Sequence, residues 1–150
     1  MKKKVLLAIV LTTVSSLSIV AHAASDFWQE TRLGYTIYGP NFWNSTPFSD
    51  LNVPRNISSI TNVSWVWHPI QNGDTTVVEL CYHRPYHTDL TLCTDITSSQ
   101  TDSTDYFDGE DARGRFYMKF KTVGSSGTYP VYSTSRTPDT LTVNYKLLNN

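Results

Sequence analysis

Apolar and polar residues alternate along much of the chain after residue 25, and no segment there shows the apolar spacing of an amphipathic helix. Val, Thr, Ser and Tyr are plentiful, and turn-forming residues recur about every 8 to 12 positions, as they do in β-sandwiches and barrels. The clearest example is the segment 114–123, in which Phe116, Met118 and Phe120 alternate with polar or aromatic residues. The pattern predicts an all-β fold, a small antiparallel β-sandwich formed by a single domain, 24–150.

Six further segments have the composition of strands: 26–39, 58–70, 75–83, 89–96, 129–135 and 139–147. In the first of them, Leu33, Tyr35 and Ile37 are expected to set the apolar face. The segment 39–56 carries three prolines and is predicted to be a loop with room for a short edge strand. The segment 97–114 is rich in Ser, Thr, Asp and Gly, and it is predicted to be a long polar loop or a weakly ordered arm.

Both cysteines of the chain lie in the stretch ELCYHRPYHTDLTLC, residues 79–93. If Cys81 and Cys93 face each other on two antiparallel strands, Leu80 and Tyr82 fall on a mostly apolar face and the cysteines on a mostly polar one. A shift of the register by one residue would mix the two faces. The sequence therefore predicts a disulfide-stapled hairpin.

The histidines of this hairpin offer an alternative interpretation as a metal site. His83 and His87 lie four residues apart, a spacing that aligns two ligands on a helix but not on a strand and turn. A zinc site would need His68 or a cysteine to complete its set of ligands. The acidic run 102–111 does not have the EF-hand spacing, and no Gly-x-Ser-x-Gly elbow is present. We therefore predict no metal, no cofactor, no catalytic residue and a protein that is not an enzyme.

The first 23 residues have the features of a secretory signal peptide. Three lysines precede an apolar stretch, and the small residues of Ala21-His22-Ala23 follow it. Thr and Ser interrupt the apolar stretch, so no membrane span is predicted, and the mature protein is expected in the periplasm or secreted. Cleavage after Ala23 would remove three of the twelve Lys and Arg and none of the thirteen Asp and Glu, which changes the net charge from −1 to −4. That charge disfavours nucleic acid as a partner.

Four tryptophans and nine tyrosines make the chain rich in aromatic residues. Trp65 and Trp67 have the same parity in their predicted strand, so we expect both to face the core. Trp43 lies in the proline-rich segment, and Tyr86 and His87 lie at the tip of the predicted hairpin. These last three residues are the candidate binding residues, because exposed aromatic side chains often anchor a protein partner or stack on sugars.

Four short motifs follow one another in the second half of the chain: Leu80-Cys81, Cys93, Pro130-Val131 and Val143-Asn144-Tyr145. With these motifs the segment 64–146 resembles the FlhE family of periplasmic flagellar proteins. None of the motifs is an active-site signature, so the resemblance bears more on the fold than on the function. The eleven residues between the two cysteines depart from the family, in which the cysteines are closer together across a tighter hairpin.

The resemblance implies a β-sandwich without a cofactor that works in the periplasm. It implies a chaperone-like regulator of flagellar assembly and export that acts through protein contacts, with flagellar export or rod components as candidate partners. An exposed sheet edge could bind extended segments of such partners, and the last strand, 139–147, is the candidate edge. The aromatic content and the enlarged hairpin leave an alternative open, a secreted β-sandwich module that binds glycans or host surfaces.

Overall fold

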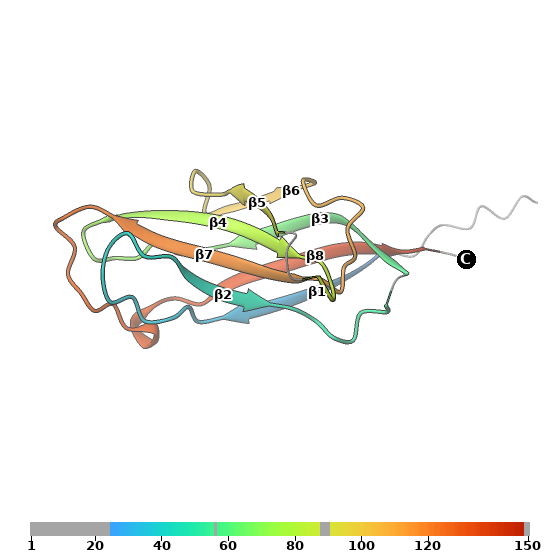
Figure 1. The fold of residues 1–150 in the computed structure, drawn as a ribbon, viewed down its shortest axis with the longest axis horizontal. Coiled ribbons are helices and arrows are strands. Elements are labelled where there is room, and N and C mark those ends of the chain that lie inside the picture. The colour runs from blue at the N-terminus through green and yellow to red at the C-terminus, as the bar shows by residue number, and fades with distance from the viewer. Residues whose placement is uncertain (1–24, 56, 88–90, 149–150) are drawn as a thin grey trace, which may run out of the picture.

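The structure, a computed structural model, describes residues 25–55, 57–87 and 91–148, so the predicted signal peptide lies outside the described residues. Two four-stranded antiparallel sheets pack face to face (Figure 1). The first sheet contains, in spatial order, β1 (Ser25–Arg32), β8 (Asp139–Leu147), β3 (Ser58–Val66) and β6 (Thr101–Thr104). The second contains β2 (Asn44–Phe48), β7 (Arg115–Val123), β4 (Thr75–His83) and β5 (Thr91–Asp95). Within the described residues, no helix is long and apolar enough to cross a membrane.

The predicted all-β sandwich is confirmed, and its core lies between the inner faces of the two sheets. In β7 the alternation places Phe116, Met118 and Phe120 inside, each at most 1% exposed. From the neighbouring strand β4, Val78 and Leu80 add to the same inner face and are completely buried. Burial of such side chains contributes about 1.5–3 kcal/mol each, so the alternating pattern supplies the main stabilisation of the fold.

Trp65 and Trp67 also face the core, as their shared parity predicted, and they are 6% and 3% exposed. Their indole N–H groups both donate hydrogen bonds to the backbone carbonyl of Ser99, at 3.0 and 2.8 Å. These bonds satisfy the polar atoms of two buried indoles. They also tie the end of β3 to the connection between β5 and β6, and so close one side of the sandwich.

The hairpin of β4 and β5 has the predicted register. Cys81 lies opposite Cys93, Leu80 lies opposite Thr94, and the disulfide is formed. The bridge sits on the outer face of the second sheet, where Cys93 is exposed and Cys81 is covered. Hydrophobic alternation and the pairing of the sulfurs therefore specify the same register, as expected when one face of a hairpin is buried.

We expect the double substitution Cys81→Ser/Cys93→Ser to lower the free energy of unfolding by about 2–3 kcal/mol. The bridge joins residues 12 apart in the sequence, and it restricts the unfolded chain more than the folded one. Urea denaturation of the double variant, and of the wild type under reducing conditions, measures the effect. A loss below about 0.5 kcal/mol in both experiments would contradict it.

The predicted strand 26–39 is wrong in its second half. Strand β1 ends at Arg32 because this residue pairs with Asp139, the first residue of β8, and no described strand pairs with the chain beyond it. Leu33 and Tyr35 are consequently 48% and 56% exposed and do not form an apolar inner face. Of the three residues expected on that face, only Ile37 is buried.

The predicted strand 129–135 is also wrong. Val131 makes a single isolated bridge with Ile37, and Ser133–Ser135 form a short 3₁₀ helix instead of a strand. Pro130 lacks a backbone N–H and so cannot continue a hydrogen-bonded ladder. In contrast, the proline-rich segment 39–56 does contain a short edge strand, β2, as its sequence allowed.

Two further expectations are corrected by the arrangement of the strands. The segment 97–114 is not only a polar loop, because it contains β6 and places Phe107 in the core with no exposed surface. The last strand, 139–147, is not an edge, because β8 lies between β1 and β3. The edges of the two sheets are β1, β6, β2 and β5.

Candidate functional site

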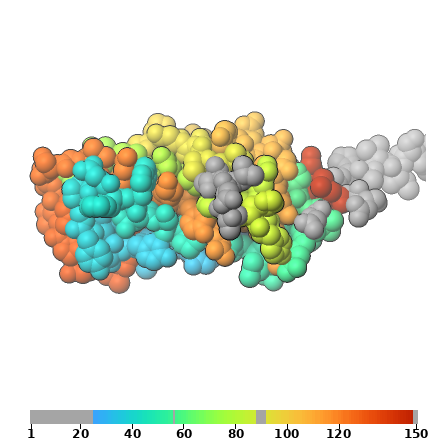
Figure 2. Space-filling model, in the orientation of Figure 1, coloured from blue at the N-terminus to red at the C-terminus, as the bar shows by residue number. Residues whose placement is uncertain are grey.

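A groove of about 500 Å³ lies on the outer face of the second sheet, where β4 ends beside the start of β7. Three segments line it: 49–55 from the β2–β3 connection, 83–87 from the end of β4 and the turn after it, and 113–117 from the start of β7. In Figure 2 the turn, in yellow-green, lies beside the green β2–β3 connection. The volume is within the range of about 300–1,000 Å³ that is typical of ligand sites. We call this feature the hairpin groove.

Two of the three candidate binding residues, Tyr86 and His87, lie in the hairpin groove. Tyr86 is 78% exposed and adopts a left-handed backbone conformation with φ of 63°. The backbone N–H of His87 donates to the carbonyl of Arg84 at 3.3 Å, which closes the turn. The guanidinium carbon of Arg55 lies 5.7 Å from the centroid of the Tyr86 ring, a cation–π distance. The tip of the hairpin is therefore joined to the β2–β3 connection.

Four arginines, which the sequence analysis did not single out, also line the hairpin groove: Arg55, Arg84, Arg113 and Arg115. Two features of the sequence could have pointed to these arginines: Arg84 lies two residues before Tyr86 in the predicted hairpin, and Arg113 and Arg115 flank a glycine at the start of a predicted strand. The pairing of His83 with Arg115 places this strand start directly beside the end of β4. Arg55 comes from a distant part of the chain, and no local pattern connects it to the others.

The four guanidinium groups differ in their partners. Arg84 forms a two-point contact with Glu110, at 2.6 and 2.5 Å, and the hydrogen bonds and charge of Glu110 raise the pKa of Arg84. Arg113 donates to the backbone carbonyl of Val53 at 3.2 Å. Arg115 lies 3.4 Å from the hydroxyl of Tyr117. In the part of the chain that the structure describes, only Arg84 among the four has a carboxylate partner.

Trp43, the third candidate, lies outside the hairpin groove, just before the edge strand β2. It is 36% exposed. The ammonium nitrogens of Lys119 and Lys121 lie 4.7 and 4.5 Å from its ring centroid. These two cation–π contacts tie the start of the edge strand to β7. An indole whose ring already holds two ammonium groups is a poor platform for stacking on a sugar.

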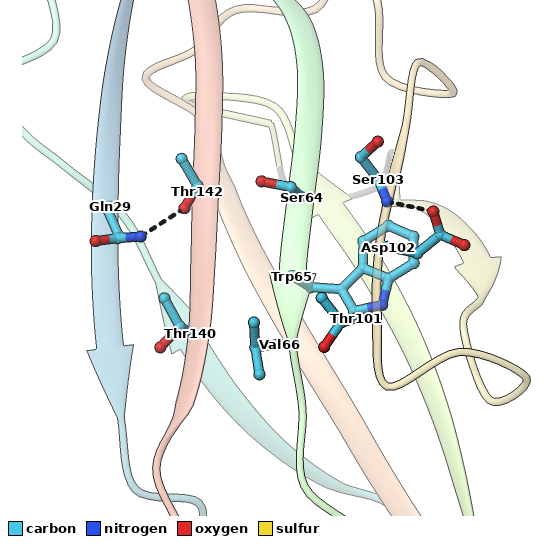
Figure 3. A pocket seen from close by; sticks show the side chains of 9 residues that line it. All are labelled: Gln29, Ser64, Trp65, Val66, Thr101, Asp102, Ser103, Thr140 and Thr142. Carbon is cyan, nitrogen blue, oxygen red and sulfur yellow. Dashed lines mark hydrogen bonds between the residues drawn. The ribbon is translucent and has the colours of Figure 1, made fainter.

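A second surface groove, of about 420 Å³, crosses the outer face of the first sheet (Figure 3). Hydroxyl and amide side chains from all four strands line it, and Gln29 donates to the hydroxyl of Thr142 at 2.9 Å across β1 and β8. Trp65, which also borders this groove, is only 6% exposed. Among the described residues that line it, Asp102 alone is charged. The surface is polar, but it offers neither an exposed ring nor a concentration of charge.

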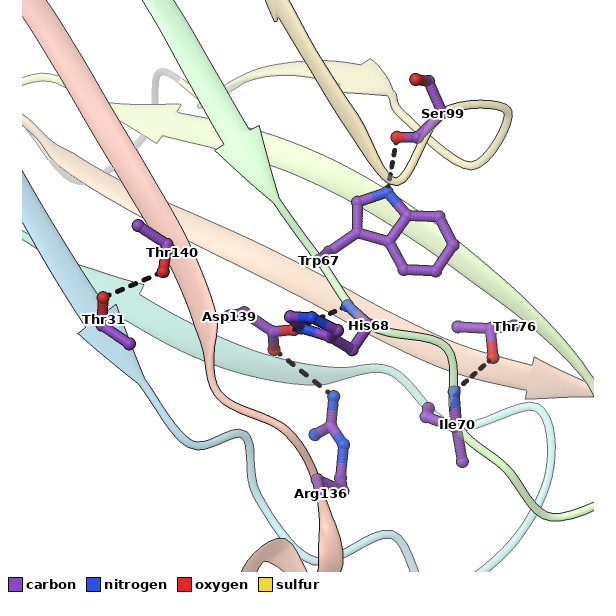
Figure 4. A network of polar contacts seen from close by, with 9 residues as sticks. All are labelled: Thr31, Trp67, His68, Ile70, Thr76, Ser99, Arg136, Asp139 and Thr140. Carbon is purple, nitrogen blue, oxygen red and sulfur yellow. Dashed lines mark hydrogen bonds and ion pairs between the residues drawn. The ribbon is translucent and has the colours of Figure 1, made fainter.

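A charged cluster is buried at the other end of the sandwich, where β8 begins (Figure 4). The carboxylate of Asp139 has no exposed surface, accepts a hydrogen bond from the backbone N–H of His68 at 2.9 Å, and lies 3.4 Å from Nη2 of Arg136. Burial raises the pKa of Asp139, and the His68 hydrogen bond and the Arg136 charge offset only part of that effect. The guanidinium of Arg136 packs 4.9 Å from the Phe120 ring and against Gly34, where a Cβ would lie 1.8 Å from it.

His68 and Asp139, together with Ser135, have the residue types of a hydrolase triad, and His68 and Ser135 line one cleft of about 200 Å³. The distances do not fit a proton relay. Nδ1 of His68 lies 3.7 Å from the Asp139 carboxylate, which is too far for a hydrogen bond, and the Ser135 hydroxyl donates to the Tyr132 carbonyl at 2.7 Å. The positions of His68, Ser135 and Asp139 therefore fit a structural role better than a catalytic triad.

Glu79, Cys81 and Cys93 bring a carboxylate and two sulfurs within 4.8 Å of one another. Both sulfurs belong to the disulfide, so neither is the thiolate that binds zinc. The Glu79 carboxylate accepts a hydrogen bond from the ammonium of Lys119 at 3.0 Å. This group of residues does not fit a metal ion.

Comparison with known proteins finds a similar structure but no similar sequence family. No family model matches the chain, and no curated protein matches it. Among solved structures, one described as the crystal structure of FlhE is similar, with a TM-score of 0.59 and 20% sequence identity, over 82% of this chain and 98% of that chain. This chain shares the FlhE fold. The resemblance noted in the sequence is thus supported for the fold, and it extends over nearly the whole of FlhE.

Proposed function

We propose that the protein is a periplasmic, non-enzymatic regulator of flagellar assembly and export that acts, in the manner of a chaperone, through protein contacts. The observation that carries the proposal is the likeness of the fold to FlhE over 98% of that chain. The disulfide is consistent with an oxidising compartment such as the periplasm. The hairpin groove and the open sheet edges are the surfaces through which such contacts would form.

The alternative function, a secreted module for glycans or host surfaces, has less support. Its main residue, Trp43, is packed against two lysines instead of presenting a bare ring. The polar groove of the first sheet has hydroxyl groups that could bind sugars, but its one indole, that of Trp65, is buried. Sugar sites in proteins commonly combine hydrogen bonds with an exposed aromatic face.

Deletion of the gene from a flagellated host tests the proposed function. We expect thin-section electron microscopy to show filaments trapped in the periplasm of the deletion strain. The full-length gene should restore normal placement, whereas a version that lacks residues 2–23 should not, because the protein would remain in the cytoplasm. Equal numbers of trapped filaments with and without the gene would contradict the proposal and direct attention to secreted fractions and glycan ligands.

A further inference from the structure

The positive charge of the protein is concentrated at the hairpin groove. Four of the six arginines of the chain line this one groove, and none of the described residues that line it is acidic, although the chain as a whole carries a net charge of −1. The nearest described carboxylate that contacts one of these arginines is that of Glu110, which pairs with Arg84. The groove is therefore a local basic site on an acidic protein.

Three of the four guanidinium groups have hydrogen-bonding capacity to offer to a ligand. Arg113 and Arg115 contact only neutral oxygens in the described structure, and Arg55 contacts an aromatic ring. A guanidinium presents its N–H donors in a planar fork that matches a carboxylate at two points. The groove can therefore hold carboxylates without first breaking an ion pair at these three residues.

The hairpin groove also has an apolar component. Leu51 and Tyr86 line it and are 68% and 78% exposed. Exposed large apolar side chains beside unpaired cations favour a ligand that carries both carboxylates and an apolar side chain. A peptide segment provides both, whereas an inorganic or sugar-bound phosphate provides only the anion.

We infer that the hairpin groove binds an acidic segment of a partner protein, with its carboxylates on Arg55, Arg113 and Arg115 and an apolar side chain against Leu51 and Tyr86. This inference rests on the proposed function insofar as that function requires protein contacts, and it names the surface and the chemistry of the partner.

Fluorescence anisotropy with the purified, oxidised protein tests the inference. The probe is a fluorescein-labelled peptide, Gly-Asp-Glu-Phe-Asp-Glu-Gly, and the matched control peptide has Lys in place of each acidic residue. We expect the acidic peptide alone to bind, with an affinity that falls as salt is added. Replacing Phe by Gly in the probe should weaken its binding, because the contact with the apolar side chains is lost.

Matched protein variants locate the site. Arg55→Glu/Arg115→Glu should raise the dissociation constant at least about tenfold, whereas Lys146→Glu, an exposed charge reversal on the first sheet, should change it less than about twofold. If the double variant fails to fold, Arg55→Glu alone serves, because this side chain is exposed and its contact among the described residues is with the Tyr86 ring. Equal loss in the Lys146→Glu variant, or binding of a heparin oligosaccharide but not of the peptide, would overturn the inference. If filaments are trapped in the deletion strain but the acidic peptide does not bind, the proposed function stands and the inferred surface is wrong.

Discussion

Replacing Asp139 by Ala is expected to lower the free energy of unfolding by about 3–5 kcal/mol, the usual cost of removing one partner of a buried ion pair. The substitution leaves the guanidinium of Arg136 buried without a counter-charge, and the backbone N–H of His68 without its acceptor. Both groups lie where β8 begins, so their loss would loosen the contact between β3, β8 and the preceding loop. Urea denaturation at neutral pH measures the effect.

Asp139→Asn is the matched control: it also removes the counter-charge of Arg136, yet it should cost less than Asp139→Ala because it keeps the side-chain volume and the acceptor for the His68 N–H. The amide oxygen can still accept from the His68 N–H, and the amide avoids the cost of burying a charge, which is what raises the pKa of Asp139. Because the folded-state pKa of Asp139 lies above its unfolded value, the folded protein takes up this proton first as the pH falls. The wild type should therefore gain stability relative to Asp139→Asn as the pH falls through the raised pKa towards 3.8. Equal losses for Ala and Asn would contradict this account.

Phe107→Ala should also lower the free energy of unfolding by about 3–5 kcal/mol, as large-to-small changes in a core do. The Phe107 ring has no exposed surface and packs 5.2 Å from Phe116 and 6.1 Å from Tyr82, measured between centroids. These two rings belong to neighbouring strands of the second sheet, β7 and β4. Removing Phe107 would leave a cavity between them and the 97–114 segment.

The neighbouring Tyr106 provides the control for Phe107. It is 52% exposed, so Tyr106→Ala should cost less than about 1 kcal/mol. Thermal or urea unfolding of the two variants separates the effects. A loss below about 1 kcal/mol for Phe107→Ala as well would mean that the segment contributes little to the core, and that its sequence-based interpretation as a polar loop is closer to its behaviour.

The parts of the fold that the sequence predicted well are those where alternation alone decides the outcome. In β7 and in the β4–β5 hairpin, one face is apolar and the other polar, so strand, register and disulfide follow from local pattern. Phe107 could not be predicted as a core residue, because the few apolar residues of this polar segment, Tyr106, Phe107 and Ala112, follow no strand or helix period. The central place of β8 could not be predicted either, because it depends on pairing with β1 and β3 from distant parts of the chain.

In the candidate site, too, the residues that a local pattern places could be predicted, and those that folding brings together from distant segments could not. Tyr86 and His87 were found because they occupy the tip of one predictable hairpin. The arginines were missed because Arg55 and the pair around Gly114 come from separate segments, which only the folded sheet brings beside the hairpin. A chain whose overall charge is negative gave no composition signal for a local basic groove.

Site-specific photo-crosslinking in a flagellated host tests most directly the claim that this protein acts on flagellar assembly through protein contacts at the hairpin groove. The crosslinker p-benzoyl-phenylalanine would replace Tyr86 in the groove or, as a control, Tyr132, which is 58% exposed and lies outside the groove. We predict a crosslink from the Tyr86 position to a flagellar export or rod component, and its loss in the Arg55→Glu/Arg115→Glu background. The same products from both positions, or the absence of any flagellar protein among the products from the Tyr86 position, would contradict the account.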